Sequence, residues 1–243
     1  MRSQFVTTSW TQVLAAREAA STESRQALEG LCHAYWYPLY ALVRRQGWGA
    51  DEARDLTQGY FAQLLEKGYL DDFDPSLGRF RVFLKTSVKH FLSKERDKAQ
   101  AWKRGGQTDI VSLDLEDTEG RYRHEPVDRL TPEEIYERRW ALTILDRALA
   151  RLRGELAEAE RAAEFDALKG FLTGEEPRLH YREVAAALSM TEAAVKMSVH
   201  RLRQRFGALL RQEIAETVAR PDDVDDEVRH LLGVIAPWGP KVS

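Results

Sequence analysis

The sequence predicts an all-α protein built from two small helical domains. Apolar residues recur at helical spacing along most of the chain, and segments that alternate apolar and polar residues are almost absent. A chain of 243 residues with 43% apolar content can bury two modest cores. Charge also divides the chain. Residues 78–106 hold nine Lys and Arg against two acids, and residues 178–212 hold seven against two. Each basic block is followed by an acidic one, which is typical of two nucleic-acid surfaces joined by acidic connectors despite a net charge of −3.

These patterns give boundaries. We predict an N-terminal extension over residues 1–27, a first domain over 28–106, an acidic linker over 107–130, a second domain over 131–215 and an acidic tail over 216–243. Helices are expected at about 11–20, 24–46, 51–67, 79–103, 132–153, 155–171, 181–187 and 191–215. Pro38 should bend or divide the second helix, and Gly47 should end it. Thr131 should cap the helix that starts with Pro132.

The stretch YREVAAALSMTEAAVKMSVHRLRQRF, residues 181–206, has the spacing of a helix-turn-helix followed by a basic helical exit. Apolar residues recur in its first part, Ser189 and Met190 form the break, and the Thr191 hydroxyl is suited to cap the second helix. In that helix Val195, Val199 and Leu202 should face inward.

The opposite face of that helix is the predicted reading face for a DNA major groove. It carries Glu192, Lys196, Met197 and His200, and Thr191 lies at its start. Arg201, Arg203 and Arg205 follow where phosphate contacts are favoured. The alternative is an amphipathic helical pair with a solvated basic face.

The block GRFRVFLKTSVKHFLSKERDKAQAWKR interleaves aromatic residues with cations. That mixture suits opened DNA, because cations follow the backbone while an aromatic ring can stack on an unpaired base. Phe83, Val88, Phe91 and Leu92 share one side and are expected in the core. For Phe80 and Trp102, core packing and DNA contact remain equal alternatives.

In ADEARDLTQGYF, residues 50–61, three polar side chains fall near one helix face opposite the apolar side: Asp51, Asp55 and Gln58. Such a face could bind a partner, although an ordinary acidic surface is the commoner case.

Catalytic signatures are missing, since the chain has no phosphate-cradling Gly-rich loop with Lys, no HExxH, no GxSxG and no paired Cys. We therefore expect a non-enzyme without cofactor or metal. The single Cys32 excludes an internal disulfide and is expected to be a buried helical thiol. No apolar run reaches membrane-spanning length and no signal peptide is recognisable, so a cytoplasmic protein that does not enter the membrane is expected.

Together these motifs resemble the bacterial sigma-70 family, specifically the two-domain extracytoplasmic-function group, over residues 28–104 and 140–212. The family's core-binding motif, roughly DAEDLxQxxF, is matched by Glu52, Ala53, Asp55, Leu56, Gln58 and Phe61. Arg54 stands where the family usually has an acid. The segment FDPSLGRFRVFLKTSVKHFL is similar to the family's loop and promoter-melting helix, with Phe83 and His90 replacing the common Trp and Asn.

The resemblance implies function and partners. The chain would bind core RNA polymerase, at the largest-subunit clamp helices and the flap, and would direct promoter recognition, DNA opening and transcription initiation. Asp51, Glu52, Asp55 and Gln58 would bind polymerase. The minus-35 contacts would come from Thr191, Glu192, Lys196, Met197, His200, Arg201 and Arg203. The minus-ten contacts would come from Phe73, Ser76, Leu77, Arg79, Phe80, Arg81, Lys85, Lys89, Arg96 and Trp102. By this resemblance the loop from Phe73 to Leu77 would lie beside a base flipped out of the minus-ten duplex. Flipping a base must be compensated by a pocket that holds it.

Alternatives stay open. One is a stand-alone helix-turn-helix regulator, and another is a sigma-like decoy for an anti-sigma factor. An anti-sigma factor or another protein regulator is also a candidate partner of a true sigma factor. The N-terminal extension, some ten extra residues between Leu152 and Tyr181 and the acidic tail depart from the family pattern. The tail's acidic cluster could fold back onto the basic DNA-binding face, or its apolar residues could form a short helix that docks an effector.

Overall fold

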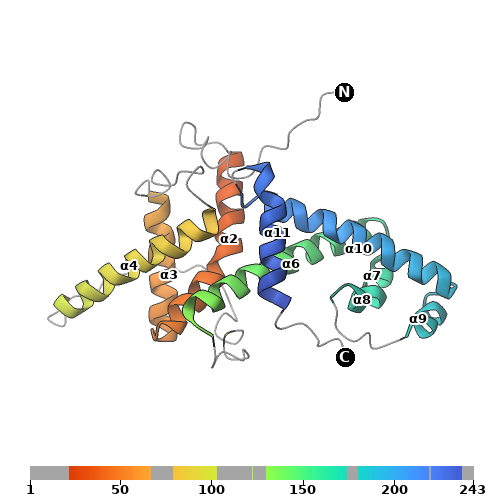
Figure 1. Ribbon diagram of the computed structural model, residues 1–243, viewed down its shortest axis with the longest axis horizontal. Coiled ribbons are helices and arrows are strands. Elements are labelled where there is room, and N and C mark those ends of the chain that lie inside the picture. The colour runs from red at the N-terminus through yellow and green to blue at the C-terminus, as the bar shows by residue number, and fades with distance from the viewer. Residues whose placement is uncertain are drawn as a thin grey trace. The chain divides into compact units, whose positions relative to one another are not determined.

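The computed structural model describes residues 22–66, 79–102, 122, 130–173, 180–218 and 220–236 (Figure 1). Over these ranges the regular secondary structure is helical, with no strand. The all-α prediction is therefore confirmed for the described part of the chain. The expected helix at 11–20, the loop at 69–78 and most of the expected linker lie outside the described residues.

Contacts divide the chain into two units. The first comprises Met1–Trp140 with Glu216–Asp223, which includes the 3-10 turn η3 (Pro221–Asp223), and the second comprises Ala141–Ala215 with Val224–Ser243. The boundary falls within helix α6 (Pro132–Glu158), whereas the sequence predicted it at Thr131.

The first unit contains α2 (Thr22–Arg45), α3 (Ala50–Glu66) and α4 (Phe80–Trp102), each within a few residues of its predicted bounds. Pro38 lies inside α2 without dividing it. Gly47 follows the helix with φ +94, a left-handed conformation that glycine adopts without a side-chain clash, and this turn leads into α3.

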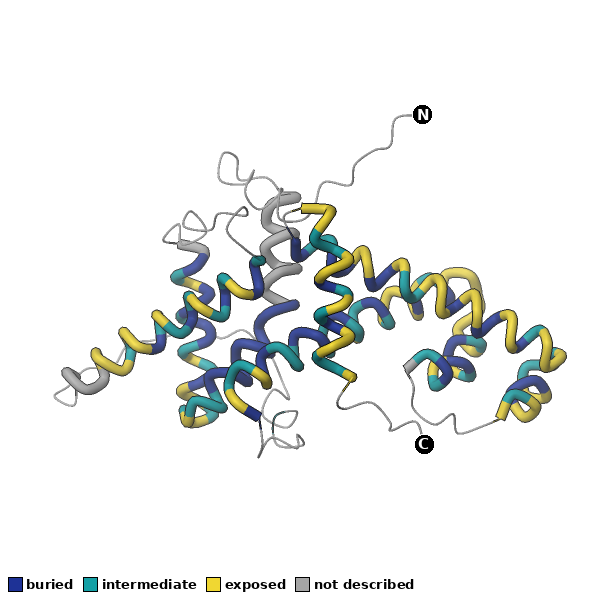
Figure 2. Tube along the Cα trace, viewed as in Figure 1, coloured by how far each residue is buried: buried dark blue, intermediate teal, exposed yellow. Residues whose placement is uncertain are grey.

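The core of the first unit forms where α2 contacts α3 and α3 contacts α4. Its fully buried side chains include Tyr35, Leu39, Leu84, Val88 and Leu92. Figure 2 shows buried positions in dark blue recurring along α2, α3 and α4. The residues from α4 recur every four positions, so they line one side of that helix. The apolar side predicted from the sequence is therefore the packed side.

The start of α6 also belongs to this core. Thr131 caps the helix as predicted: its hydroxyl accepts a hydrogen bond from the Glu134 amide at 3.2 Å, and its own amide donates to the Glu134 carboxylate at 2.8 Å. Ile135, Tyr136 and Trp140 then lie fully buried. Side chains that were expected to begin the second domain thus complete the first.

The second unit contains the remainder of α6, then α7 (Ala162–Leu168), α8 (Gly170–Thr173), α9 (Tyr181–Ala187), α10 (Glu192–Ala215) and α11 (Val224–Ile235). The helix expected over 155–171 is interrupted, because α6 continues to Glu158 and a turn follows in which Glu160 has φ +59. The predictions for 181–187 and 191–215 match α9 and α10 closely.

A buried charge ties α6 to α10 in this unit. The Glu213 side chain is 2% exposed and accepts hydrogen bonds from Arg147 Nε at 2.7 Å and Arg151 Nη1 at 2.8 Å. A buried carboxylate requires such partners, because desolvation without compensation is costly. The pair of arginines therefore orients α10 along α6.

Candidate nucleic-acid interface

Helices α9 and α10 pack closely through small and branched residues. Ala185 and Val184 are buried on α9, and Val195, Val199 and Leu202 are buried on α10, as the sequence predicted. Ser189 turns the chain between them with φ +53, a conformation for which many such turns use Gly. The Thr191 hydroxyl accepts a hydrogen bond from the Ala194 amide at 3.2 Å and so caps α10.

The opposite face of α10 is open to solvent. Glu192, Lys196, Met197, His200 and Arg201 are all exposed, and the Met197 side chain stands out as a large exposed apolar group at 52%. A mixed face of this kind offers hydrogen-bond donors, an acceptor and an apolar contact to a partner surface.

Lys196 is positioned by an aromatic pair. Its ammonium lies 5.6 Å from the centre of the Tyr181 ring, and Tyr181 stacks on Phe171 with ring centres 4.6 Å apart. The attraction between a cation and an aromatic face holds the ammonium near the start of α9. The sequence placed Lys196 on the outer face but gave no sign of this support.

Arg203 has a structural contact that the sequence did not predict. Its Nη2 and Nε donate to the backbone carbonyl of Phe171 at 2.9 and 3.3 Å, so its guanidinium holds α8 against α10. Arg205, which was grouped with it as a phosphate contact, pairs with Glu155, and its Nε lies 2.7 Å from that carboxylate. All three predicted phosphate contacts remain exposed, but Arg203 and Arg205 are also engaged in these contacts with their own chain.

The predicted polymerase-binding face of α3 is placed only in part as expected. Asp51, Glu52 and Asp55 are exposed, but Gln58 is only 8% exposed. Three residues turn a helix by about 300°, so Gln58 lies about 60° from Asp55. Because α3 is covered by both α2 and α4, that rotation is enough to bury it. The prediction that Gln58 shares the open face is therefore wrong.

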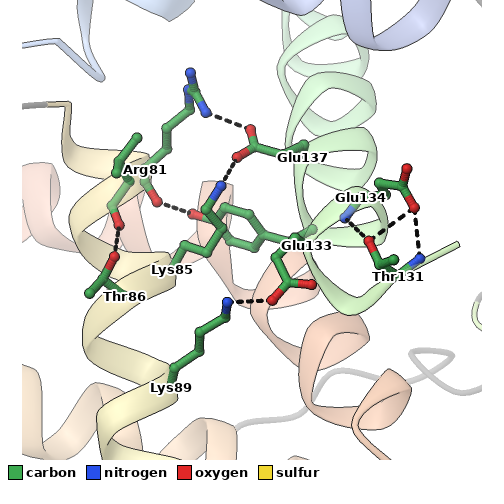
Figure 3. A network of polar contacts seen from close by, with 10 residues as sticks. Arg81, Lys85, Thr86, Lys89, Thr131, Glu133, Glu134 and Glu137 are labelled. Carbon is green, nitrogen blue, oxygen red and sulfur yellow. Dashed lines mark hydrogen bonds and ion pairs between the residues drawn. The ribbon is translucent and has the colours of Figure 1, made fainter.

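Three cations of α4 pair with carboxylates from the start of α6 (Figure 3). Arg81 Nη1 donates to Glu137 Oε2 at 2.6 Å, and Lys85 pairs with the other oxygen of Glu137. One turn further along, Lys89 pairs with Glu133. The hydrogen bond from Lys89 holds the pKa of Glu133 below its ordinary value, against the raising effect of burial.

Arg81 is part of the core rather than a free cation. Its side chain is 8% exposed, its guanidinium lies 5.3 Å from the centre of the Trp140 ring, and its carbonyl accepts a hydrogen bond from the Tyr136 hydroxyl at 2.9 Å. Burial raises the pKa of that hydroxyl, so it remains a donor at neutral pH. The expectation that Arg81 contacts DNA is not compatible with this packing.

Phe80 is a core residue as well. It is 2% exposed, meets Tyr35 edge-on at 5.4 Å between ring centres and stacks on Phe83 at 5.9 Å. The structure thus decides between the two alternatives for Phe80, and its expected contact with DNA is wrong for this fold. Phe73, Ser76 and Leu77 and the side chain of Trp102 lie outside the described part of the structure. Arg79 is half-buried at the start of α4.

Arg96 is exposed but already supported. Its Nη2 donates to the Gln46 carbonyl at 3.1 Å, and its guanidinium lies 5.4 Å from the centre of the Trp48 ring. Further along the same helix Lys94 and Lys98 are exposed. The cations of α4 thus differ in availability, from buried Arg81 to these exposed side chains.

The acidic tail contains α11, the short helix of one of the two alternatives, while effector docking by that helix stays a prediction. Leu231 is fully buried, α11 packs against α10, and Asp225 pairs with Arg211, which lowers the pKa of Asp225. Arg211 lies fifteen residues after Lys196, about 22 Å along the helix axis. In this arrangement Asp225 does not reach the open face near Lys196.

Comparison with protein-family models, with curated proteins and with solved structures found no match. Within the described ranges, none of the helices has the length and apolar character needed to cross a membrane. Over the same ranges, no group of three or more His, Cys, Asp or Glu side chains could hold a metal ion.

Sequence reasoning missed the residues that face α4 from α6. The sequence indicates that Glu133 and Glu137 lie in an acidic region at the start of a helix, and it places Tyr136 and Trp140 in the second domain, without any partner on α4. One signal was present: the two acids are four residues apart, and so are Lys85 and Lys89. On each helix a spacing of four places the two charges on one face, so two such faces can pair when the helices pack together.

Proposed function

We propose that this protein is a promoter-specificity subunit of RNA polymerase, similar to sigma factors of the extracytoplasmic-function type. In this proposal α9 and α10 form a helix-turn-helix that reads duplex DNA, and the first unit binds core polymerase and the opened strand. The observation that carries the proposal is the open face of α10. Its base-reading candidates Lys196, Met197 and His200 are exposed together, whereas Val195 and Val199 of the same helix are buried.

Two features of the first unit support the polymerase part of the proposal. Asp51 and Asp55 are exposed on α3, one helical turn apart, and offer a negative surface to a basic partner. Arg54 lies between them and comes within 3.7 Å of Asp51. This cation weakens the negative surface. We therefore expect the affinity for polymerase to differ from that of extracytoplasmic-function sigma factors, which usually have an acid at this position.

The decisive experiment is run-off transcription with purified core polymerase, followed by sequencing of the transcripts selected from a random promoter library. The proposal requires defined start sites that depend on the protein. Asp55→Arg should reduce co-purification with core polymerase, because it places like charge in the contact. Asp97→Arg makes the same charge change on exposed α4 surface and serves as the matched control.

Retention of full core affinity by Asp55→Arg would remove the main support for the sigma proposal. Sequence-specific duplex binding with no response to core polymerase would instead favour a stand-alone regulator. Core binding without any selected promoter would favour a decoy that engages regulators of true sigma factors.

A further inference from the structure

We infer that Glu133 and Glu137 form an acidic mask over the basic face of α4. Their carboxylates compete with nucleic-acid phosphate for Lys89 and Lys85. This inference rests on the proposed function in one respect, namely that α4 meets opened DNA. It adds that the chain itself limits the strength of that contact. The basic face is defined here as Lys85 and Lys89, whose side chains remain 22% and 41% exposed.

The charges match in spacing as well as in sign. Lys85 and Lys89 are one helical turn apart on α4, and Glu137 and Glu133 are one turn apart on α6, in the opposite order along the chain (Figure 3). Because the two helices run antiparallel here, the Glu137 carboxylate meets the Lys85 ammonium while the Glu133 carboxylate meets the Lys89 ammonium. A phosphate backbone that followed this face would have to replace the same charge-assisted contacts.

Apolar packing keeps these carboxylates in place. Ile135 and Tyr136 lie between Glu133 and Glu137 along α6, and Trp140 follows one turn later. All three of these apolar side chains are fully buried. Burying these side chains stabilises the packing of α6 far more than an exposed ion pair does. The acids are therefore held at high effective concentration beside the lysines, and the ion pairs need not be strong to compete.

The buried Arg81–Glu137 pair is a fixed structural contact, whereas the exposed Lys89–Glu133 pair is the one that phosphate can replace. The pair with Arg81 orients the Glu137 carboxylate, so Lys85 meets an acceptor that another cation already holds. Lys89 and Glu133 are each 41% exposed, and their pair can open into solvent. The Lys89–Glu133 pair is consequently the part of the mask that a single charge-removing substitution tests most cleanly.

The test uses the full-length protein and a fluorescent oligo-dT strand, with binding followed by anisotropy over a salt titration. Glu133→Gln should raise affinity at low salt by about two- to fivefold, as expected for release of one exposed pair. The slope of log affinity against log salt should steepen by about 0.7, the contribution of one additional phosphate contact on a single strand. Glu137→Gln should act in the same direction through Lys85, with Arg81 still able to donate to the amide oxygen.

Asp97→Asn is the matched control. It removes one negative charge from exposed α4 surface beside Arg96 without opening the pairs of Lys85 and Lys89, so its effect reports the loss of a charge on α4 with both pairs intact. Circular dichroism of each variant verifies that the helices persist. Equal effects of Glu133→Gln, Glu137→Gln and Asp97→Asn would overturn the inference, as would a failure of all of them to bind the strand.

Run-off transcription separates this inference from the proposed function. Active transcription with no gain in strand binding by Glu133→Gln would overturn the mask alone. A gain in strand binding by a protein that selects no promoter would overturn the sigma proposal and leave the mask in place.

Discussion

Arg81 and Glu137 form a nearly buried ion pair within the first unit, with side chains only 8% and 12% exposed and a 2.6 Å separation between Nη1 and Oε2. Buried pairs of this kind contribute little net stability, because desolvation offsets most of the attraction. What the pair fixes is the register of α6 on α4. Lys85 and Lys89 then meet Glu137 and Glu133 in turn, and a helix predicted to contact DNA along its length is partly occupied by its own chain.

The contact between Arg203 and the Phe171 carbonyl predicts a stability role. Arg203→Ala should lower the free energy of unfolding by about 0.5 to 1.5 kcal/mol, because the carbonyl loses its donors. Arg201→Ala removes an exposed arginine and is the control, because it should leave the free energy of unfolding unchanged. It should weaken binding to all duplexes similarly and lower the slope of log affinity against log salt by about one unit. Urea denaturation and a salt titration measure the two effects. Equal stability of both variants would contradict the assigned role of Arg203.

Lys196 should read bases, with Tyr181 holding it in position. Lys196→Ala should change preference at one or two positions of a selected minus-35 duplex, at a cost of about 1 to 3 kcal/mol on the preferred sequence. Tyr181→Leu removes the ring under the ammonium and should reproduce part of that change, about 0.5 to 1 kcal/mol, whereas Tyr181→Phe keeps the ring and should not. Binding to single-base variants of the duplex is the measurement. Losses that are equal on every sequence would show that this face positions the protein without reading DNA.

The Lys89–Glu133 pair predicts a defined dependence of stability on pH. Hydrogen bonding by Lys89 lowers the pKa of Glu133 in the folded state, so the pair stabilises the protein above the unfolded-state pKa and is lost as pH falls through the folded-state value. Both side chains are 41% exposed, so the contribution should stay within about 1 kcal/mol. The difference in unfolding free energy between wild type and Glu133→Gln should be constant near neutral pH and should shrink under acid conditions. A difference that grows on acidification would have the wrong sign for this pair.

Glu213 should be the most sensitive single charge in the second unit. Glu213→Ala removes the acceptor for Arg147 and Arg151 and should destabilise this unit by about 1.5 to 3 kcal/mol, the usual range for hydrogen bonds to charged groups. Glu213→Gln keeps an acceptor and should cost less. Thermal unfolding of the two variants provides the comparison, and identical values for Ala and Gln would mean that packing rather than the hydrogen bonds matters at this position.

Local patterns in the sequence determined most of the helices. Apolar recurrence, the Thr131 cap and the turn at Ser189 are properties of neighbouring residues, and the structure has α9, α10 and the start of α6 where these signals predicted them. The open face of α10 followed from the same periodicity, because the residues opposite buried Val195 and Val199 had to face solvent.

Tertiary contacts decided which polar residues stay available. Periodicity gives the direction of a side chain from its own helix but not the neighbour that covers it, so the burial of Gln58 on α3 and of Phe80 and Arg81 on α4 could not be read from spacing alone. The same limit applies to the boundary between the two units. A cap and a charge run mark where a helix begins, whereas the burial of Ile135, Tyr136 and Trp140 determines which core it joins. The sequence determined the helices and their faces, while packing between distant segments determined which cations of α4 remain for another molecule, because an ion pair needs two side chains brought together in space.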